Sequence, residues 1–517
     1  MNRELSPRRP GIGPRLLDLD RVAASAERLL RATSGRAWWV AAAGTLTAGG
    51  AAAGLHAPIA GAWFWQLADG ELIRHYGLVG TARFLAQSGA PLDLRSWLAD
   101  LGLAFIYRGG GLTGLAITGA VAGMAVGVCL WLAIRSTGRA HPLVAMVAGG
   151  VCLLALAPVL TDLSAELLAV LIAGLIPILT LATRRGWAGK LALVGLVILW
   201  SNVQADAAVG LMLIWVWLVV AHWDARQPGR PAAPSWWLIP ATGLALLLSP
   251  RGLGAIAELP LSLGMQGEHP LLVAWSSIDF HPWSARVSEL AAVMLLFSYW
   301  LAGSRLRRVD AYLGLATAVL ALLWSNYLPW FLVVAAVQGS WYLSVAGLRP
   351  GAASSRAVGR GKGRGATGSR AKITAAIPPL IALVVLGSGL GALTRGSGVS
   401  GQTAAHLPVR AAHWLADHPA AGSWFTTPLF GDYLSSQFPA DHHLLCVDDP
   451  VPLAGTGLGR CEQLTVLNAG ALGTLQALHP RLAVLPRAAP AATFLRAEGW
   501  VIRYRDPTTV ILAPRHL

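Results

Sequence analysis

The chain has 517 residues, of which 55% are hydrophobic and only 13% are charged, and its mean hydropathy is +0.56. A soluble domain carries about 25% charged residues, so this composition excludes an ordinary soluble protein and indicates a polytopic membrane protein. The net charge of +15 would suggest a nucleic-acid partner for a soluble protein. In a membrane protein the same excess belongs to cytoplasmic loops that face anionic lipid, so we expect membrane lipid, and no nucleic acid, as a partner.

The N-terminal segment 1–37 is basic and is predicted to be cytoplasmic. Eight Arg and four acidic residues precede the first apolar run, which is too long and too acidic for the start of a signal peptide. Apolar residues recur at helical spacing and predict an amphipathic helix in the membrane plane, at Leu16, Leu19, Val22, Ala26 and Leu29.

Eleven apolar runs predict transmembrane helices, although several are shorter than the ~20 residues that cross a bilayer without tilt. The runs are 38–55, 112–134, 141–160, 164–183, 188–201, 205–222, 235–249, 287–303, 310–324, 328–347 and 373–394. The sequence therefore predicts an α-helical membrane protein with a transmembrane core over 38–347. A basic, Gly-rich linker (348–372) and a last transmembrane helix (373–394) follow.

The distribution of basic residues predicts the orientation of these helices. With the N-terminus inside, 25 of the 40 Lys and Arg residues fall in short, dense inner segments. The positive-inside rule then favours a cytoplasmic N-terminus and an outer C-terminus, in a plasma or inner membrane. In this orientation the long outer segments are the loops 56–111 and 250–286, together with everything after residue 394.

The region 395–517 differs in composition and predicts a small extracytoplasmic α/β domain. Expected strands lie in 422–428, 443–449, 481–486, 500–506 and 508–514, and expected helices in 409–419, 433–438, 461–469 and 491–499. Asp506-Pro507 lies between two β-rich runs and predicts a terminal hairpin. Cys446 and Cys461 can form a disulfide if the domain is outside the cytoplasm.

The polar stretch SNVQAD (201–206) interrupts two apolar runs at a predicted outer helix end. Polar groups at membrane depth are expected to be functional, so Asn202, Gln204 and Asp206 are candidate substrate-binding residues. A short polar turn at the membrane interface is the alternative interpretation. Ser325 and Asn326 occupy a further outer helix end.

The outer loops supply the other candidates. A carboxylate near the membrane surface can act as a general base, which makes Asp69 and Glu71 candidate catalytic residues. Arginine can hold a phosphate through two hydrogen bonds, as a lipid-phosphate substrate would require. The remaining candidate substrate-binding residues are Trp63, Trp65, Arg74, His75, Arg95 and Arg251. The sequence has no metal-binding motif, so no metal site is predicted, and a divalent metal cofactor has no support from the sequence.

Short motifs along the chain resemble those of a bacterial branch of the GT-C-type polytopic membrane glycosyltransferases, which use dolichyl- or polyprenyl-phosphate sugars. The counterparts are AGAWFWQLADGE (60–71), HYG (75–77), ARFL (82–85), RSWLAD (95–100), NVQA (202–205), SPRG (249–252), FGDYL (430–434) and VDDP (447–450). The resemblance covers nearly the whole chain after residue 40. It implies a GT-C-like core and an outer C-terminal domain.

The chain departs from this pattern at ionisable positions. The family's first-loop acids fall on Ala60 and Ala62, its following His falls on Gln66, and a later Asp falls on Ala82. The His of the helix-end motif becomes Gln204. The aromatic and glycine framework is retained without the usual base, and Asp69 can replace that base if the loop is shifted by about one helical turn.

Two functions follow from the resemblance. The first is a glycosyltransferase that transfers a sugar from a polyprenyl-phosphate donor to an extracytoplasmic acceptor. The second is a non-catalytic relative that binds lipid or organises a complex through its outer domain, which the substituted motif positions favour. A transporter is a weaker third hypothesis, because the sequence shows neither an internal repeat nor a charge deep in a span.

Overall fold

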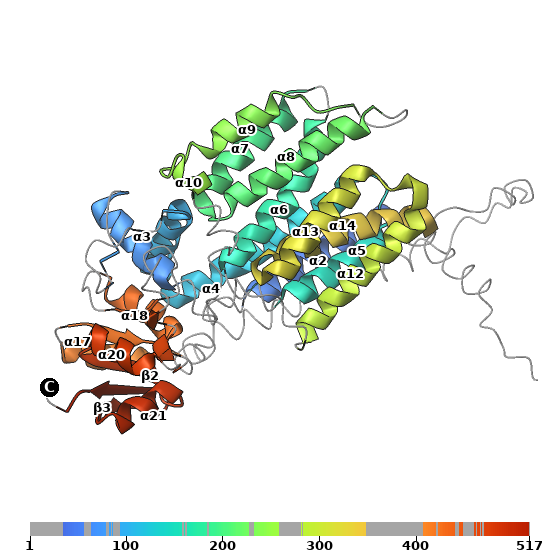
Figure 1. Ribbon diagram of the computed structural model, residues 1–517. Helices are drawn as coiled ribbons and strands as arrows, with labels where there is room; N and C mark the ends of the chain where they lie inside the picture. Colours follow the sequence, from blue (N-terminus) through green and yellow to red (C-terminus); the bar gives the residue numbers. More distant parts are fainter. Residues whose placement is uncertain are drawn as a thin grey trace, which may run out of the picture.

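The computed structural model describes residues 35–55, 64–78, 94–157, 163–183, 186–226, 232–257, 283–347, 407–419, 422–439, 444–447 and 470–515, with a few short pieces between them. Helices form most of this structure, and a small sheet lies near the C-terminus (Figure 1). Several predicted features lie outside the described residues. They are the N-terminal amphipathic helix, the linker 348–372, the span 373–394, Trp63 and most of the loop 250–286.

Every predicted span between residues 38 and 347 contains a helix. These helices are α2 (Arg36–Gly54), α4 (Trp97–Ser136), α5 (Pro142–Leu156), α6 (Leu163–Ala182), α7 (Ala188–Val203), α8 (Ala207–Asp224), α9 (Leu238–Leu246), α12 (Trp283–Ala302), α13 (Arg308–Leu323) and α14 (Leu328–Gly347). Among the described residues, four helical stretches are long and apolar enough to cross a membrane, namely 97–136, 207–224, 285–305 and 325–346. Together these helices form the core of a polytopic membrane protein.

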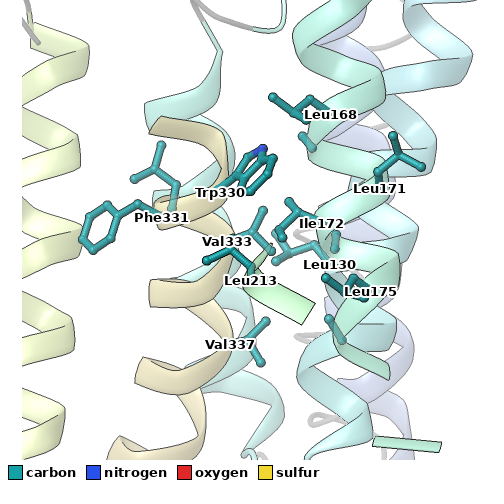
Figure 2. Packing of buried hydrophobic residues seen from close by; sticks show 14 of the residues in the cluster. Leu130, Leu168, Leu171, Ile172, Leu175, Leu213, Trp330, Phe331, Val333 and Val337 are labelled. Carbon is teal, nitrogen blue, oxygen red and sulfur yellow. The ribbon is translucent and has the colours of Figure 1, made fainter. Parts of the chain in front are cut away.

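The helix α14 lies at the centre of the membrane core. In Figure 2, Trp330 and Val333 lie on the side of α14 that faces Ile172 of α6, and Phe331 points to the opposite side. The helices α12 and α13 also pack on α14. Large apolar side chains on these two outer helices remain exposed, including Leu296, Trp300 and Leu315. Such a surface is expected of helices that face lipid tails.

The first outer segment was predicted as a loop over 56–111, but its described residues are largely helical. It contains α3 (Phe64–Tyr76) and the beginning of α4, so the predicted span 112–134 is the second part of a 40-residue helix. This helix is kinked at Gly111, where φ is +55°, a conformation that glycine adopts without steric cost. At Gly70 a side chain would clash with the backbone carbonyl of Asp100, so α3 packs directly against α4.

The C-terminal domain contains a four-stranded sheet in the order β1-β2-β4-β3. The strands are β1 (Trp424–Thr426), β2 (Leu482–Pro486), β3 (Val501–Arg505) and β4 (Thr509–Ala513), and the helices are α17 (Val409–Asp417), α18 (Pro428–Gln437), α20 (Ala471–Leu478) and α21 (Pro490–Ala497). The strand β1 is parallel to β2, and the other pairs are antiparallel. The predicted terminal hairpin is confirmed, since Asp506 Oδ1 accepts the backbone N–H groups of Thr508 and Thr509 in its turn.

One prediction for this domain was wrong, and one of its helices was not predicted. The run 443–449 is not a strand in the described structure, where Leu444 makes only isolated bridges. Its neighbour Cys446 is instead tied to Cys461 by the disulfide that the sequence allowed, with 5.6 Å between the Cα atoms. The helix α20 was not predicted, because ALGTLQAL reads as well as a buried strand when only its apolar character is considered.

The C-terminal domain shares a hydrophobic core with the first outer segment. Phe64 of α3 makes an edge-to-face contact with Tyr433 of α18, with 5.1 Å between the ring centroids. Leu103, from the first part of α4, joins the same buried cluster. Figure 1 shows α3 lying beside α18. This second core is separate from the one around α14, and α4 contributes residues to both.

Candidate functional site

The polar stretch predicted at 201–206 forms the turn between α7 and α8, at the end of the membrane helices nearer to the C-terminal domain. We call this the domain-facing end; it comprises residues 95–100, 201–206, 248–251 and 324–327. Asp206 lies in the turn, outside both helices, and is 2% exposed. Its carboxylate accepts hydrogen bonds from Tyr327 Oη at 3.3 Å and from Asn326 Nδ2 at 3.4 Å. Both donors belong to the short 3₁₀ helix η6 (Ser325–Tyr327) that precedes α14.

Two arginines from distant parts of the chain act on the same carboxylate. Burial raises the pKa of Asp206 to about 6, and the positive charges of Arg95 and Arg251 partly oppose that rise. Arg95 precedes α4 and is 4% exposed, and Arg251 follows α9 and is half-buried. The structure therefore brings together three residues predicted from separate motifs. A carboxylate whose pKa is close to neutral can accept a proton, and guanidinium groups can hold a phosphate.

Asn202 holds the elements around this turn in place. Its Oδ1 accepts a 2.7 Å hydrogen bond from the indole N–H of Trp97, at the start of α4. Its Nδ2 donates to the carbonyl oxygens of Ile198 at 2.8 Å and of Leu248 at 3.2 Å. One side chain thus links α7 to the beginning of α4 and to the end of α9. Gln204 is also buried, and its backbone N–H donates the last hydrogen bond of α7, to the carbonyl oxygen of Trp200.

The predicted residues of α3 form a second group. Glu71 Oε2 accepts two hydrogen bonds from Arg74, at 2.9 Å from Nε and 2.7 Å from Nη2. Arg108 Nη1 lies 3.6 Å and His75 Nε2 lies 3.8 Å from the same oxygen. Glu71 is therefore surrounded by basic groups within an ion-paired cluster on α3 and α4.

The aromatic and acidic residues that precede this cluster are more enclosed. Asp69 is fully buried one residue before the close contact of Gly70 with α4. Trp65 is half-buried in the first turn of α3. Among the described residues, no three His, Cys, Asp or Glu side chains come together as a metal site would require.

Sequence reasoning missed two members of the Asp206 site. Tyr327 follows the polar pair Ser325-Asn326, which was recognised as a helix end but not connected with Asp206. Trp97 lies inside the RSWLAD stretch, from which only the ionisable residue Arg95 was chosen as a candidate, and its indole N–H donor was not considered. The signal available for both was a Tyr or Trp next to a polar helix end. A buried Tyr O–H or Trp N–H usually donates a hydrogen bond to a nearby polar group.

Neither a protein-family model nor a curated protein matches the sequence. Among solved structures, the fold is similar to that of the Archaeoglobus fulgidus oligosaccharyltransferase tethered with an acceptor peptide containing the NVT sequon, with a TM-score of 0.50 and 10% identity. The match covers 83% of this chain and 65% of that one. The A. fulgidus oligosaccharyltransferase AglB in complex with an inhibitory peptide and a dolichol-phosphate matches with a TM-score of 0.49, 11% identity, and 83% and 66% coverage.

At this level of identity the comparison concerns the fold. The chain has a GT-C-like fold, with a helical membrane core and a small C-terminal domain that contains a sheet, as the sequence predicted. It spans about two thirds of the length of the oligosaccharyltransferase it resembles. Because one fold hosts different functions, the activity has to be argued from the site.

Proposed function

We propose that this protein is an integral membrane glycosyltransferase of the GT-C type that transfers a sugar from a polyprenyl-phosphate donor to an extracytoplasmic acceptor. The observation that carries the proposal is the meeting of Arg95, Asp206 and Arg251 at the domain-facing end of a GT-C-like fold. A donor of this kind presents a phosphate at the membrane surface, next to the sugar carbon that reacts. A buried acid flanked by two arginines offers chemistry suited to both groups.

In the proposed reaction the acceptor hydroxyl attacks the anomeric carbon of the donor. The bond between that carbon and the phosphate oxygen breaks, and polyprenyl phosphate leaves with the bonding electron pair. Asp206 takes the proton of the hydroxyl, while Arg95 and Arg251 stabilise the negative charge that develops on the departing phosphate. Asn202 and Gln204 position the turn that carries Asp206.

The other predicted residues keep subsidiary roles in the proposal. Asp69 is the alternative base, because it lies in the segment that resembles the family's acidic motif. Glu71 is a weaker candidate, since Arg74 and Arg108 already surround its carboxylate. Trp65, together with Trp63, Arg74 and His75, is proposed to border the path of the sugar or the lipid chain.

We also propose that the domain-facing end lies outside the cytoplasm and that the N-terminus lies inside, in a plasma or inner membrane. The Cys446–Cys461 disulfide supports this orientation, because disulfides persist in oxidising compartments. The opposite ends of the membrane helices carry basic residues such as Arg135, Arg226 and Arg305, as expected of cytoplasmic loops.

The test is sugar transfer by the purified full-length protein in lipid, with a panel of polyprenyl-phosphate sugars and a mixed acceptor pool. Release of polyprenyl phosphate and loss of donor are both measured. The variants Asp206→Asn and Arg95→Gln are compared with Glu289→Gln and Arg286→Gln, whose side chains are exposed on α12. We expect the first two to lose most of their turnover and the two controls to retain it. Full turnover in both Asp206→Asn and Arg95→Gln would contradict the assignment.

A non-catalytic relative is the second candidate, and two observations favour it. The family's acidic positions fall on Ala60 and Ala62, and the C-terminal domain shares a core with the first outer segment, as expected of a docking platform. Binding of polyprenyl phosphate that is weakened by Arg95→Gln, without turnover of any donor, would support this candidate over the enzyme.

A further inference from the structure

A cavity of about 160 Å³ lies at the opposite end of the membrane helices from Asp206. We call this the basic end; it comprises residues 135–141, 183, 186–190, 224–226 and 303–308. The ends of α4, α6 and α8 enclose the cavity together with the start of α13, and α14 forms a further wall. A single buried water needs only ~10–15 Å³ of such space, so the cavity has room for a small organic group.

Asp224 supplies negative charge to this cavity. It is the last residue of α8, is 4% exposed and lines the cavity wall. In the part of the chain that the structure describes, its Oδ1 is buried and has no hydrogen-bond partner. The next basic residue along the chain, Arg226, is exposed to solvent. Leaving a buried carboxylate oxygen unsatisfied is costly, which points to a donor that a ligand provides.

The other charged groups of the cavity already neutralise each other. Arg307 donates to Asp310 through Nε at 2.7 Å and through Nη2 at 2.8 Å, and Tyr342 Oη donates to the same carboxylate at 2.6 Å. The guanidinium of Arg307 also lies 4.0 Å from the ring centroid of Trp341. Of the two acidic residues that line the cavity, Asp310 is paired with Arg307, and Asp224 has no cationic partner among the lining residues.

Four hydroxyl groups add hydrogen-bond acceptors to the same cavity. Each donates its own proton to a helix carbonyl, which leaves oxygen lone pairs available; the residues are Ser136, Thr137, Thr180 and Thr183. A carboxylate with several neutral acceptors suits a cation that carries N–H groups. A primary ammonium has three such donors, whereas a quaternary ammonium has none.

The remaining walls suit an amphiphile with a second polar group. Trp341 presents an indole N–H that is buried and, among the described residues, has no acceptor. Ile176, Leu179 and Trp217 supply apolar surface. The cavity thus offers an anion for an ammonium, a donor for an oxyanion, and an apolar wall for a glycerol or chain segment, near the ends of the membrane helices.

We propose that this cavity binds the primary-ammonium headgroup of a phospholipid, with the ammonium at Asp224 and the Ser and Thr oxygens and the phosphate at the indole N–H of Trp341. The site is distinct from the proposed transfer site, since it lies at the other end of the membrane core. Headgroup occupancy would join α4, α6, α8 and α14 at that end.

The test uses purified full-length protein and measures lipid retention by native mass spectrometry, together with the thermal shift produced by added lipid. Phosphatidylethanolamine is compared with phosphatidylcholine and phosphatidylglycerol of the same chains. Soluble phosphoethanolamine distinguishes a headgroup site from a lipid site. We expect phosphatidylethanolamine to bind at least about tenfold more tightly than phosphatidylcholine, the size expected for a charge-assisted hydrogen bond.

Two variants and one control complete the experiment. Asp224→Asn is expected to abolish the preference, and Glu289→Gln, which removes an exposed acid from α12, is expected to leave it unchanged. Thr180→Val removes an acceptor without altering charge and is expected to reduce the preference about threefold, so the proposal stays testable if Asp224→Asn fails to fold. Equal binding of the ethanolamine and choline lipids by the unmodified protein would overturn the proposal, as would an unchanged preference in a folded Asp224→Asn variant. Loss of sugar transfer bears only on the other site.

Discussion

The two ends of the membrane core bury carboxylates in different ways. At the basic end, Asp310 is paired with Arg307, three residues earlier, and receives a 2.6 Å hydrogen bond from Tyr342. At the domain-facing end, Asp206 receives hydrogen bonds of 3.3 and 3.4 Å and lies in the field of two arginines from remote segments. The short local pair suits a structural role, and the second arrangement suits a site that exchanges protons and binds an anion.

The largest effect that tests this difference is expected from Asp206→Asn. Removing a general base lowers turnover by about 10²–10⁴-fold. Because the amide relieves the burial of a charge, we expect the thermal unfolding temperature at pH 7 to stay level or rise. Sugar transfer and unfolding are measured on the same preparation, with Glu289→Gln as the control. If Asp206→Asn transferred sugar normally but unfolded at a lower temperature, Asp206 would have a structural role and not a catalytic one.

The opposite outcome is expected from Asp310→Asn. The charge of Arg307 then loses its partner, and breaking a buried pair costs about 3–5 kcal/mol. Since the Arg307 side chain is 31% exposed, solvent screening reduces the expected loss to about 2 kcal/mol. Equilibrium unfolding in mixed micelles measures the loss, and Asp417→Asn, an exposed acid on α17, is the matched control. Turnover is expected to stay close to that of the unmodified protein, because Asp310 is at the opposite end of the membrane core from the proposed transfer site.

The acidity of Asp206 gives a smaller and graded effect. With a pKa of about 6 in the folded protein, turnover is expected to fall about tenfold for each pH unit below 6, as the base becomes protonated. The variant His75→Gln should keep this inflection, because the imidazole on α3 is not part of the Asp206 group. If the inflection disappeared in His75→Gln and persisted in Asp206→Asn, the titrating group would not be Asp206, and this prediction would be wrong.

The same group has a signature in stability. The folded pKa of Asp206 lies above its ordinary value, so the folded protein holds the proton more tightly than the unfolded chain does. This contribution to stability is fully present below pH ~4 and is lost as the pH rises through about 6, by about 3 kcal/mol in total. Asp206→Asn should remove that part of the pH dependence.

The smallest predicted effect is a shift in the pH dependence of the residual turnover that Arg95→Gln retains at saturating donor. The positive charge of Arg95 lowers the pKa of Asp206, so its removal should move the inflection of turnover to higher pH. Arg286→Gln, an exposed arginine on α12, should not move it. A downward shift, or none, would indicate that the two charges do not interact.

Much of the fold followed from the sequence, because apolar runs and turn residues are local signals. The helices α5, α6, α7 and α8 begin within a few residues of the predicted spans, and the terminal hairpin lies where Asp506-Pro507 placed it. The helix α3 in the first outer segment was not predicted. The helix α3 is stabilised by burial of Phe64 and Leu67 in a core that includes a domain some 350 residues later, and no local pattern encodes that partner.

The candidate site was predicted only as separate pieces. Arg95, Asp206 and Arg251 were each singled out, but from three motifs without a reason to place them together. Tyr327 was missed because its role depends on how α14 packs beside the turn between α7 and α8. Asp69 and Glu71 drew attention as acids in a polar stretch, yet sequence alone did not reveal that Glu71 is held by Arg74 and Arg108.

The course of α4 has a practical consequence. Its first part, with Leu103, shares a buried cluster with the C-terminal domain, as does Leu115 just after the kink, and the rest of its second part, with Val126 and Leu130, packs among the membrane helices. A chain cut at residue 394 would thus expose the apolar faces of α3 and of the beginning of α4 to water, and residues 395–517 expressed alone would lack part of their hydrophobic core. The C-terminal domain and the membrane core therefore depend on each other for stability, and truncation that separates them should yield aggregates.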